Sequence, residues 1–466
     1  LLTMTATTPV WGKLADLFSK KLLVQSALVI YSVGSLVAGL APSMGVLIGA
    51  RAFQGLGVGG LTALVQVVIA SMVSPRERGR YAGYIGATFA LATVSGPLIG
   101  GLIVDAPGLG WRWTFFIGIP VAALAFVVLQ KTLHLPVVRR QVHVDYLGAT
   151  LLVAGVSILL VWVSLAGQQF AWGSASSVGL VVAGLVVVAT ALYVEARIAV
   201  EPVIPLRLFR DRTTALATVS SVLVGLAMFG STVYLSQYFQ LARAMSPTTA
   251  GLMSVAMVGG LVVSSMVSGR MITRTGRWKH FLTGGMVLVV AGLALLAMID
   301  DTTSLVVVGA YMGVLGLGLG AAMQNLVLAV QNNVAQADLG AASSVVTFFR
   351  SMGGSIGVSA LGAVLSHQVA DRIAAALAGL GIQRPVEGGS IPDVTTLEEP
   401  FRSIVQHAFG EATGHLFLVA VPFAALALFC VLFIEEVPLR TTILREDEIS
   451  PEVAAELSHA PAGERR

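Results

Sequence analysis

The sequence predicts an all-α membrane protein that crosses the bilayer many times. Its 466 residues are 56% hydrophobic and only 11% charged, with a mean hydropathy of +0.86, whereas soluble domains carry about 25% charged residues. The apolar residues form blocks of about 18 residues or more, the length that a helix needs to cross the hydrocarbon core. Helices satisfy their own backbone hydrogen bonds in lipid, and the short alternating segments of a β-barrel do not appear.

Taken in chain order, the apolar blocks predict one partial span and twelve full spans. The partial span covers residues 1–11. The full spans cover residues 22–41, 44–73, 80–104, 114–132, 146–166, 176–199, 213–240, 246–268, 280–299, 303–332, 341–367 and 411–434.

The loops between these spans predict the orientation. About 21 Lys and Arg residues lie in one set of alternate loops and the tail, and about 5 lie in the other set. Because cytoplasmic loops carry the excess of positive charge, we expect a multi-pass protein of the cell (inner) membrane with a cytoplasmic C-terminus. The net charge of +4 then reflects topology and not nucleic-acid binding. The tail 435–466 is polar and is expected to be disordered. The external segment 368–410 is expected to contain a short helix, "ADRIAAALAGL", followed by a loop.

An internal repeat divides the chain. "GKLADLFSKK" at Gly12–Lys21 is followed about 260 residues later by the similar "GRMITRTGRWK" at Gly269–Lys279. Further pairs keep nearly the same offset: "GLGVGG" at Gly55–Gly60 with "GLGLGA" at Gly316–Ala321, and "PRERG" at Pro75–Gly79 with "QADLG" at Gln336–Gly340. Repeated halves are typical of secondary transporters. We therefore expect a transporter half at 1–132, two inserted helices within 133–212, and a second half at 213–434.

The repeat and the acidic residues together predict a further helix upstream of residue 1. Two spans precede Gly269, but only a partial span precedes Gly12, and residue 1 is Leu. Every Asp and Glu lies in a loop, a tail or a span end, with Asp105 and Glu195 nearest to the membrane. An embedded carboxylate can carry a proton across the bilayer, so a proton-carrying acid is expected in that upstream helix.

Several motifs together carry a family resemblance over nearly the whole chain. The first is Gly-x-Leu-Ala-Asp followed by a basic end, although Ser19 stands where a second glycine is usual and Lys20 replaces an arginine. The second is Arg-x-x-Gln-Gly-x-Gly, which begins at Arg51, and the third is Gly-Pro-x-x-Gly-Gly, which begins at Gly96. "WRWTFFIGIP", with Gly118 where asparagine is usual, and "FFRSMGGSIG" add to them. This set resembles the major facilitator superfamily, in particular its fourteen-helix drug:proton antiporters.

The resemblance implies roles for three sets of residues. The first motif is a conformational latch between the halves, the arginine of the second is linked to proton coupling, and the third is a hinge and seal that marks antiport. The residues are Gly12, Asp16, Lys20 and Lys21 for the latch, Arg51 for coupling, and Gly96, Pro97, Gly100 and Gly101 for the hinge. Plainer alternatives remain open for each set: the lysines follow the charge rule, Arg51 reaches the interface, and the glycines only pack closely.

Other polar residues inside the spans are candidates for a substrate pocket. Tyr234, Gln237 and Tyr238 share one helix face by their spacing, although Tyr238 also fits an aromatic belt at the interface. The full candidate set is Gln66, Tyr234, Gln237, Tyr238, Gln324 and Asn325. Arg350 lies about ten residues inside its span. It needs carbonyl or acidic partners there, because a charge in the membrane is costly.

These observations predict a proton-coupled exporter of lipophilic or amphipathic compounds that works by alternating access. An exporter of an endogenous lipid or metabolite is a second interpretation, and a non-transporting membrane receptor or scaffold is a third. No enzyme motif, metal-ligand pattern or cofactor signature appears. Cys430 is the only cysteine, so no disulfide can form within the chain. The expected partners are the substrate, H+ and the bilayer, with no nucleic acid, and the chain is expected to be a monomer.

Overall fold

The computed structural model describes residues 1–439 except 107, 135–144, 168, 200 and 380–398, and it leaves 440–466 undescribed. A few side chains within helices, including those of Pro97 and Gly101, are also outside the description. Most of the predicted tail 435–466 and the middle of the predicted segment 368–410 therefore lie outside the described residues.

The described chain is helical throughout, apart from turns and one isolated β-bridge between Ala166 and Phe170. The N-terminal helices are α1 (Leu2–Leu17), α2 (Lys20–Gly39), α3 (Met44–Met72), α4 (Pro75–Asp105), α5 (Trp113–Phe116) and α6 (Gly118–Thr132). A helical pair follows, α7 (Tyr146–Leu165) and α8 (Ala175–Arg197). The C-terminal helices begin with the 3-10 helix η1 (Leu206–Arg210), then α9 (Arg212–Gln237), the π-helix η2 (Tyr238–Ala242), α10 (Pro247–Met253), α11 (Val255–Thr275), α12 (Lys279–Leu296), α13 (Leu305–Asn333), the 3-10 helix η3 (Gln336–Asp338), α14 (Leu339–Gly379) and α15 (Phe401–Leu432).

Within the described residues, eleven helices are long and apolar enough to cross a membrane. This confirms the predicted all-α, multi-pass class. The predicted span 80–104 corresponds to α4, which is continuous over 31 residues but includes side chains outside the description. The predicted spans 114–132, 213–240 and 246–268 each divide into two consecutive helical pieces.

Side-chain caps mark where several helices begin. In each case a Ser or Asp oxygen accepts a hydrogen bond from a backbone N–H of the first turn, which otherwise has no partner. The capping residues are Ser43 for α3, Asp145 for α7, Ser174 for α8 and Asp211 for α9. Gly276 ends α11 with a φ of 74°, a left-handed conformation that glycine adopts without steric cost.

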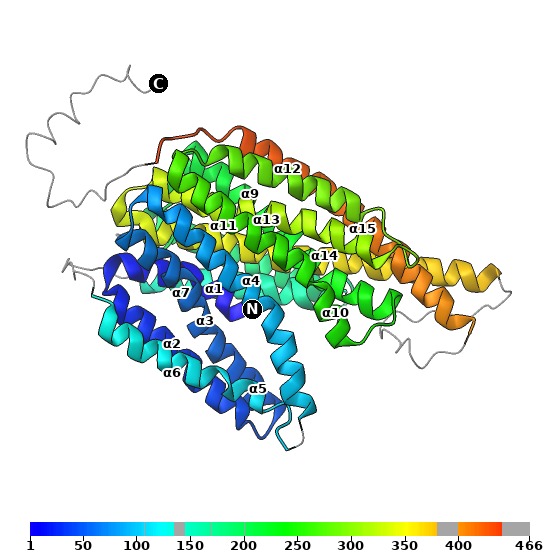
Figure 1. Ribbon diagram of the computed structural model, residues 1–466. Coiled ribbons are helices and arrows are strands. Elements are labelled where there is room, and N and C mark those ends of the chain that lie inside the picture. The colour runs from blue at the N-terminus through cyan, green and yellow to red at the C-terminus, as the bar shows by residue number, and fades with distance from the viewer. Residues whose placement is uncertain (107, 135–144, 168, 200, 380–398, 440–466) are drawn as a thin grey trace, which may run out of the picture.

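The segment 368–410 differs from the prediction where the structure describes it. "ADRIAAALAGL" does not form a separate short helix, because α14 runs without a break over 41 residues to Gly379. At 1.5 Å per residue α14 is about 60 Å long, twice the hydrocarbon thickness. α15 begins at Phe401, ten residues before the predicted start. Arg372 donates to Glu411 across the two helices at 3.0 Å, and both helices project together from the bundle (Figure 1).

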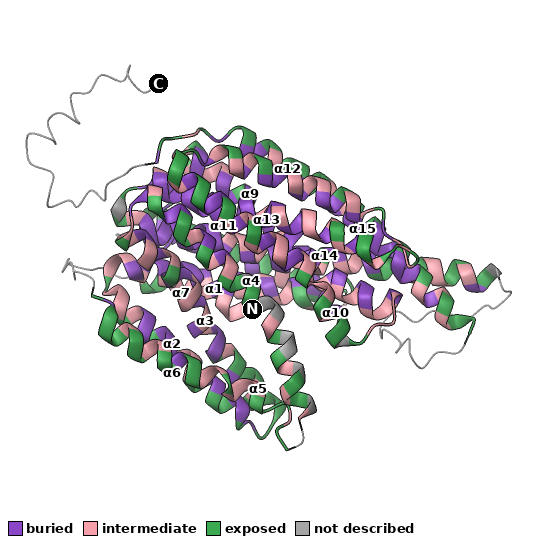
Figure 2. Cartoon of the chain, viewed as in Figure 1, coloured by how far each residue is buried: buried purple, intermediate pink, exposed green. Residues whose placement is uncertain are grey.

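The packing forms two groups of helices joined at one end. α4 packs against α11, and α1 packs against α14, so two helix pairs connect the N-terminal and C-terminal helices. The α7–α8 pair packs beside α1 and α14. Figure 1 shows α2, α5 and α6 lying apart from α12 and α15. Buried side chains gather in the C-terminal helices (Figure 2), whereas α6 buries only Ala122. We call the end where α1 finishes and α14 begins the basic end.

Candidate functional site

Asp16 joins the N-terminal and C-terminal helices at the basic end. Its two carboxylate oxygens accept hydrogen bonds from the backbone N–H groups of Gly340 and Ala341, each at 2.8 Å. These N–H groups belong to the first turn of α14 and have no partner within the helix. The carboxylate therefore lies at the positive end of the α14 dipole, where a negative charge is stabilised.

Burial acts against this arrangement. It raises the pKa of the Asp16 carboxyl to about 7, although the N–H groups of Ala341 and Gly340 and the charges of Lys20 and Lys13 oppose the rise. The desolvation cost of the carboxylate is thus set against two charge-assisted hydrogen bonds.

Two glycines allow α1 and α14 to approach closely beside Asp16. A Cβ atom added at Gly12 would lie 2.6 Å from the carbonyl oxygen of Gly340 and would also collide with the side chain of Ser344. A Cβ at Gly340 would collide with the carbonyl oxygen of Gly12. Small residues let helix backbones meet in this way.

A second contact between the groups also joins a charged side chain to backbone groups at a helix end, but here the charge is positive. Arg76, in the first turn of α4, donates to the carbonyl oxygens of Thr273 and Arg274 at 3.1 and 2.9 Å. These carbonyls are at the C-terminal end of α11, where the helix dipole favours a cation. Close by, Gly79 and Gly269 bring the backbones of α4 and α11 together.

The internal repeat relates these two contacts. Gly12 and Gly269 are matched by the repeat, and so are Gly79 and Gly340. In the fold, Gly12 meets Gly340 and Gly79 meets Gly269. The loop motif of the first copy therefore packs against the start of α14, and the loop motif of the second copy packs against the start of α4. Thr273 stands where the first copy has Asp16, and Arg76 supplies the polar bonds at that contact instead.

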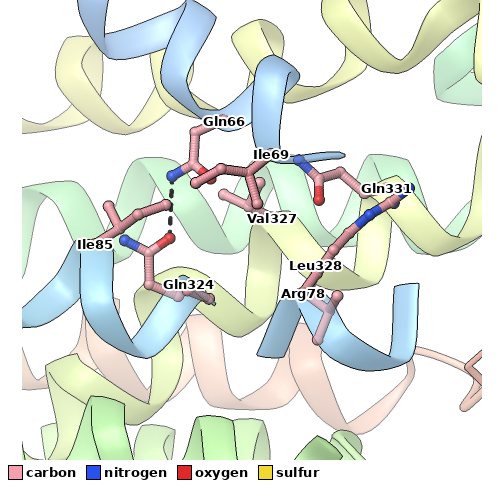
Figure 3. A pocket seen from close by; sticks show the side chains of 9 residues that line it. Gln66, Ile69, Arg78, Ile85, Gln324, Val327, Leu328 and Gln331 are labelled. Carbon is pink, nitrogen blue, oxygen red and sulfur yellow. Dashed lines mark hydrogen bonds between the residues drawn. The ribbon is translucent and has the colours of Figure 1, made fainter. Parts of the chain in front are cut away.

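A hydrogen-bonded pair of glutamines connects α3 of the N-terminal helices with α13 of the C-terminal helices. Gln66 on α3 donates to the side-chain oxygen of Gln324 on α13 at 3.1 Å, and Figure 3 shows the two amides facing each other. Arg78 and Gln331 line the same cavity. The free volume of about 10 Å³ is about what one water molecule needs. The cavity between these side chains therefore has room for about one water molecule.

A segment between the helical pair and α9 connects to both sides of the Asp16 contact. Lys13 on α1 forms an ion pair with Glu201 at 2.5 Å. Arg207 pairs at 2.8 Å with Asp338, which directly precedes α14. Residues 201–207 are therefore tied to the N-terminal helices through Lys13 and to the C-terminal helices through Asp338.

The two lysines of the predicted latch do not bridge the helix groups. The ammonium of Lys21 donates to the carbonyl oxygen of Gln130 near the end of α6 at 2.7 Å, so it links two N-terminal helices. Lys20 lies at the start of α2, near enough to influence the charge of Asp16. Of the four latch residues, Gly12 and Asp16 make the contact with α14.

Arg51 lies on the exposed side of α3. Its guanidinium donates to the side-chain oxygen of Gln54 at 2.6 Å, and Gln54 in turn donates to Ser35 at 2.5 Å. The guanidinium also lies 5.4 Å from the ring centre of Phe115. Among the described residues, these contacts involve no carboxylate.

The predicted hinge residues lie in α4, beyond the part that packs against α11. A Cβ added at Gly96 or Gly100 would meet no atom within 4 Å. The side chain of Pro97 and residue Gly101 fall outside the described side chains. The α4 glycines that do pack against α11 are Gly79, Gly83 and Gly86, nearer to the basic end.

The predicted pocket residues do not come together as one set. Tyr234 and Tyr238 are buried in the core of the C-terminal helices, and their hydroxyls donate to the carbonyl oxygens of Val358 and Asp300. Asn325 donates to the carbonyl oxygen of Ala321 in its own helix at 2.6 Å. Gln237 is half-buried. Gln66 and Gln324 are the members that meet.

Arg350 lies in the interior of α14, and its guanidinium donates to the carbonyl oxygen of Met323 on α13 at 3.5 Å. Among the described residues, no group of three or more His, Cys, Asp or Glu side chains could hold a metal ion.

Two features of the site were not singled out from the sequence. The partners of Asp16 are backbone groups of α14, and Arg76 was assigned only to a basic loop. The repeat contained part of this information, because it aligned Pro75–Gly79 with Gln336–Gly340. The repeat did not indicate that the loop motif of each copy would pack against the helix start of the other copy.

Comparisons with known proteins agree on one family. The family model described as Major Facilitator Superfamily matches residues 1–358. A protein of Mycobacterium tuberculosis described as an uncharacterized MFS-type transporter is 34% identical over 442 residues, 94% of this chain and 63% of its own length. The efflux pump dotC of Dothistroma septosporum is 31% identical, over 95% of this chain and 77% of its own length. The multidrug transporter protein MdtP of Bacillus subtilis is 32% identical, over 78% and 67%.

Solved structures share the fold at low identity. The human organic anion transporter MFSD10 aligns with a TM-score of 0.58 and 15% identity, over 91% of this chain and 81% of that one. The proton:xylose symporter XylE aligns with a TM-score of 0.56 and 12% identity, over 93% and 85%. At such identities the likeness concerns the fold alone. The chain spans 63% of the length of the mycobacterial relative.

Proposed function

Because the chain belongs to the major facilitator superfamily, a family of transporters and not of enzymes, we propose that it is a proton-coupled exporter of lipophilic or amphipathic compounds. Relatives described as an efflux pump and a multidrug transporter support export. Since the chain spans 63% of the length of the first of its relatives, the activity is proposed for the protein of which this chain is part.

The observation that carries this proposal is the pair of repeat-related contacts at the basic end. Asp16 with α14, and Arg76 with α11, hold the two helix groups together at one end through groups that water could replace. Hydrogen bonds that join the two groups are found at this end and at the Gln66–Gln324 pair. Breaking these bonds and rocking the groups apart gives alternating access.

In this proposal the basic end faces the cytoplasm, as the positive-inside rule requires. The C-terminus then lies in the cytoplasm, and the conformation described is closed to it. The protein is a monomer in the cell membrane, with transporter halves at 1–132 and 213–434 and two inserted helices within 133–212. The substrate binds on the external side of the Gln66–Gln324 pair, which closes the path below it.

Efflux from cells tests the function directly. Cells that make the native protein are loaded with a lipophilic fluorescent dye, and the initial efflux rate is compared with that of cells carrying an empty vector. We expect faster efflux that an uncoupler abolishes. Equal efflux in both cell lines would overturn export, whereas faster efflux that persists with uncoupler would overturn proton coupling alone.

A further inference from the structure

Arg350 carries a positive charge within α14, one of the helices that are long and apolar enough to cross a membrane. It follows Leu339, the first residue of α14, by eleven positions, which places it about 16 Å from the basic end of the helix. The hydrocarbon core is about 30 Å thick, so this depth is close to its centre. The side chain belongs to the interior of the molecule and keeps a partly exposed surface.

The protein supplies little to balance this charge. The one hydrogen bond recorded for the guanidinium, to the carbonyl of Met323, has a length of 3.5 Å, beyond the usual range. Of the helices that pack against α14, α3, α7, α9 and α13 contain no Asp or Glu, whereas α1 carries Asp16 at the basic end and α15 carries Glu411 near the far end of α14. On α14 itself the only acid is Asp371, which is 21 residues or about 31 Å away. A buried charge without a partner is unfavourable, so a ligand that supplied one would be strongly held.

The surroundings of Arg350 are built to hold it in place. Gly225 on α9 allows that helix to touch the backbone of Arg350, and Gly353 makes a similar close contact with Val222. Met323 is the neighbour in sequence of Gln324, which forms the polar pair with Gln66. The backbone of α14 at Arg350 is thus packed closely against α9, and its guanidinium reaches α13 one residue before the polar pair.

We propose that Arg350 binds an anionic group of the transported compound, a carboxylate, sulfonate or phosphate carried on an apolar body. This inference rests on the proposed export function and narrows its substrate class. A guanidinium forms two parallel hydrogen bonds with such a group. The apolar walls of the path accept the rest of the molecule, and the anion neutralises the charge when both leave water.

A pair of matched probes tests this site. The native protein is purified into lipid nanodiscs and titrated with 1-pyrenebutyrate and with 1-pyrenebutanol, and binding to empty nanodiscs is subtracted. The two probes share the apolar body and differ in the carboxylate. We expect the carboxylate to bind at least about tenfold more tightly, because a charge-assisted pair away from water is strong.

Variants then locate the preference. Arg350→Gln should remove the difference between the probes, and Arg350→Lys should keep part of it, because the charge remains without the planar fork. Arg277→Gln, which removes the same charge from an exposed loop, should leave the preference as in the native protein. A preference that survives in Arg350→Gln would overturn the assignment.

Failure of this inference can be told apart from failure of the proposed function. If the native protein in liposomes transports both probes at equal rates and binds them equally, export stands and the anion site falls. If it transports neither probe nor any lipophilic dye, the function falls. The native protein alone decides between these results, and Arg350→Lys, which keeps the charge, locates the preference if Arg350→Gln does not fold.

Discussion

Asp16 is the residue that most directly connects the two helix groups. Its carboxylate accepts hydrogen bonds from two backbone N–H groups of α14, while burial raises the pKa of the carboxyl. An aspartate gains nothing from the positive-inside rule, which explains the lysines around it. Asp16 therefore makes the contact with α14, whereas the positive-inside rule accounts for the lysines of the loop.

Asp16→Asn should slow efflux about tenfold while the protein still folds. The amide keeps the shape but can accept only one of the two hydrogen bonds, and its NH2 group faces the other N–H. The loss of one charge-assisted hydrogen bond is about 1.5–3 kcal/mol. Initial efflux rates and the thermal unfolding midpoint are the measurements. Asp371→Asn, at the exposed far end of α14, is the matched control and should transport like the native protein.

Arg76→Gln should slow efflux several-fold by weakening the second contact. Its guanidinium donates to two carbonyl groups of α11, and a glutamine in its place loses the charge that the helix end favours. Arg80→Gln is the control on the same helix, because Arg80 is exposed and bonds to Tyr84 within α4. Similar efflux rates in the two variants would show that Arg76 has no part in closing this end.

At the scale of helices, glycines decide how closely α4 and α11 approach. A Cβ added at Gly269 would collide with the carbonyl group of Gly79, whereas a Cβ at Gly259, on the same helix, meets no atom within 4 Å. The two glycines differ only in whether they face the partner helix. Helix–helix contact in the membrane depends on such close approach.

Gly269→Ala should therefore reduce efflux at least about tenfold, and Gly259→Ala should have little effect. The added methyl group keeps α4 and α11 apart at the basic end, so the closed state costs more to form. Efflux rates of cells with equal amounts of each variant in the membrane give the comparison. Equal activity of the two variants would contradict a role for this packing in the transport cycle.

Most helices could be predicted from the sequence, because apolar length is a strong signal in membrane proteins. The predicted helix ends were wrong where a polar sequence continues a helix beyond its expected membrane span. "ADRIAAALAGL" is polar enough to leave the membrane, but its residues favour a helix, so α14 continues to Gly379. The same applies to the first ten residues of α15. A hydropathy pattern shows where the membrane ends and not where the helix ends.

The site was predictable only in part, for a geometric reason. The sequence indicated Gly12 and Asp16 as contact residues, but their partners Gly340 and Ala341 are backbone donors with no signal of their own. Helical spacing placed Tyr234 and Tyr238 on one face. It could not indicate whether that face lines a path or the core, and their hydroxyls bond to carbonyls of neighbouring segments.

At the scale of the whole molecule, two related contacts with opposite charge join the two helix groups at one end. A carboxylate meets the N-terminal end of α14, and a guanidinium meets the C-terminal end of α11. Residues 201–207 add ion pairs to both sides of the first contact. Opening this end requires the Asp16 and Arg76 contacts to break, together with one of the two ion pairs that tie residues 201–207 to either side.

Removing one of the added ion pairs should favour opening. Glu201→Gln takes the partner from Lys13, which is 6% exposed, so the buried ammonium gains by moving into water. We expect a larger fraction of the protein with the basic end open, seen as faster labelling of a cysteine placed at Ser344, which is fully buried against Gly12, in a Cys430→Ser background. Glu435→Gln, whose exposed partner Arg212 is 4.0 Å away, should leave the labelling rate unchanged.

The distance across the basic end is the measurement that tests the central claim most directly. Spin labels are placed at Phe18, after α1, and at Arg277, after α11, both exposed, in a Cys430→Ser background. A reversible closure predicts two distances whose proportions change when a transported dye is added, with Asp16→Asn increasing the longer one. A single distance that neither dye nor Asp16→Asn alters would contradict the account, because the contacts would then be permanent.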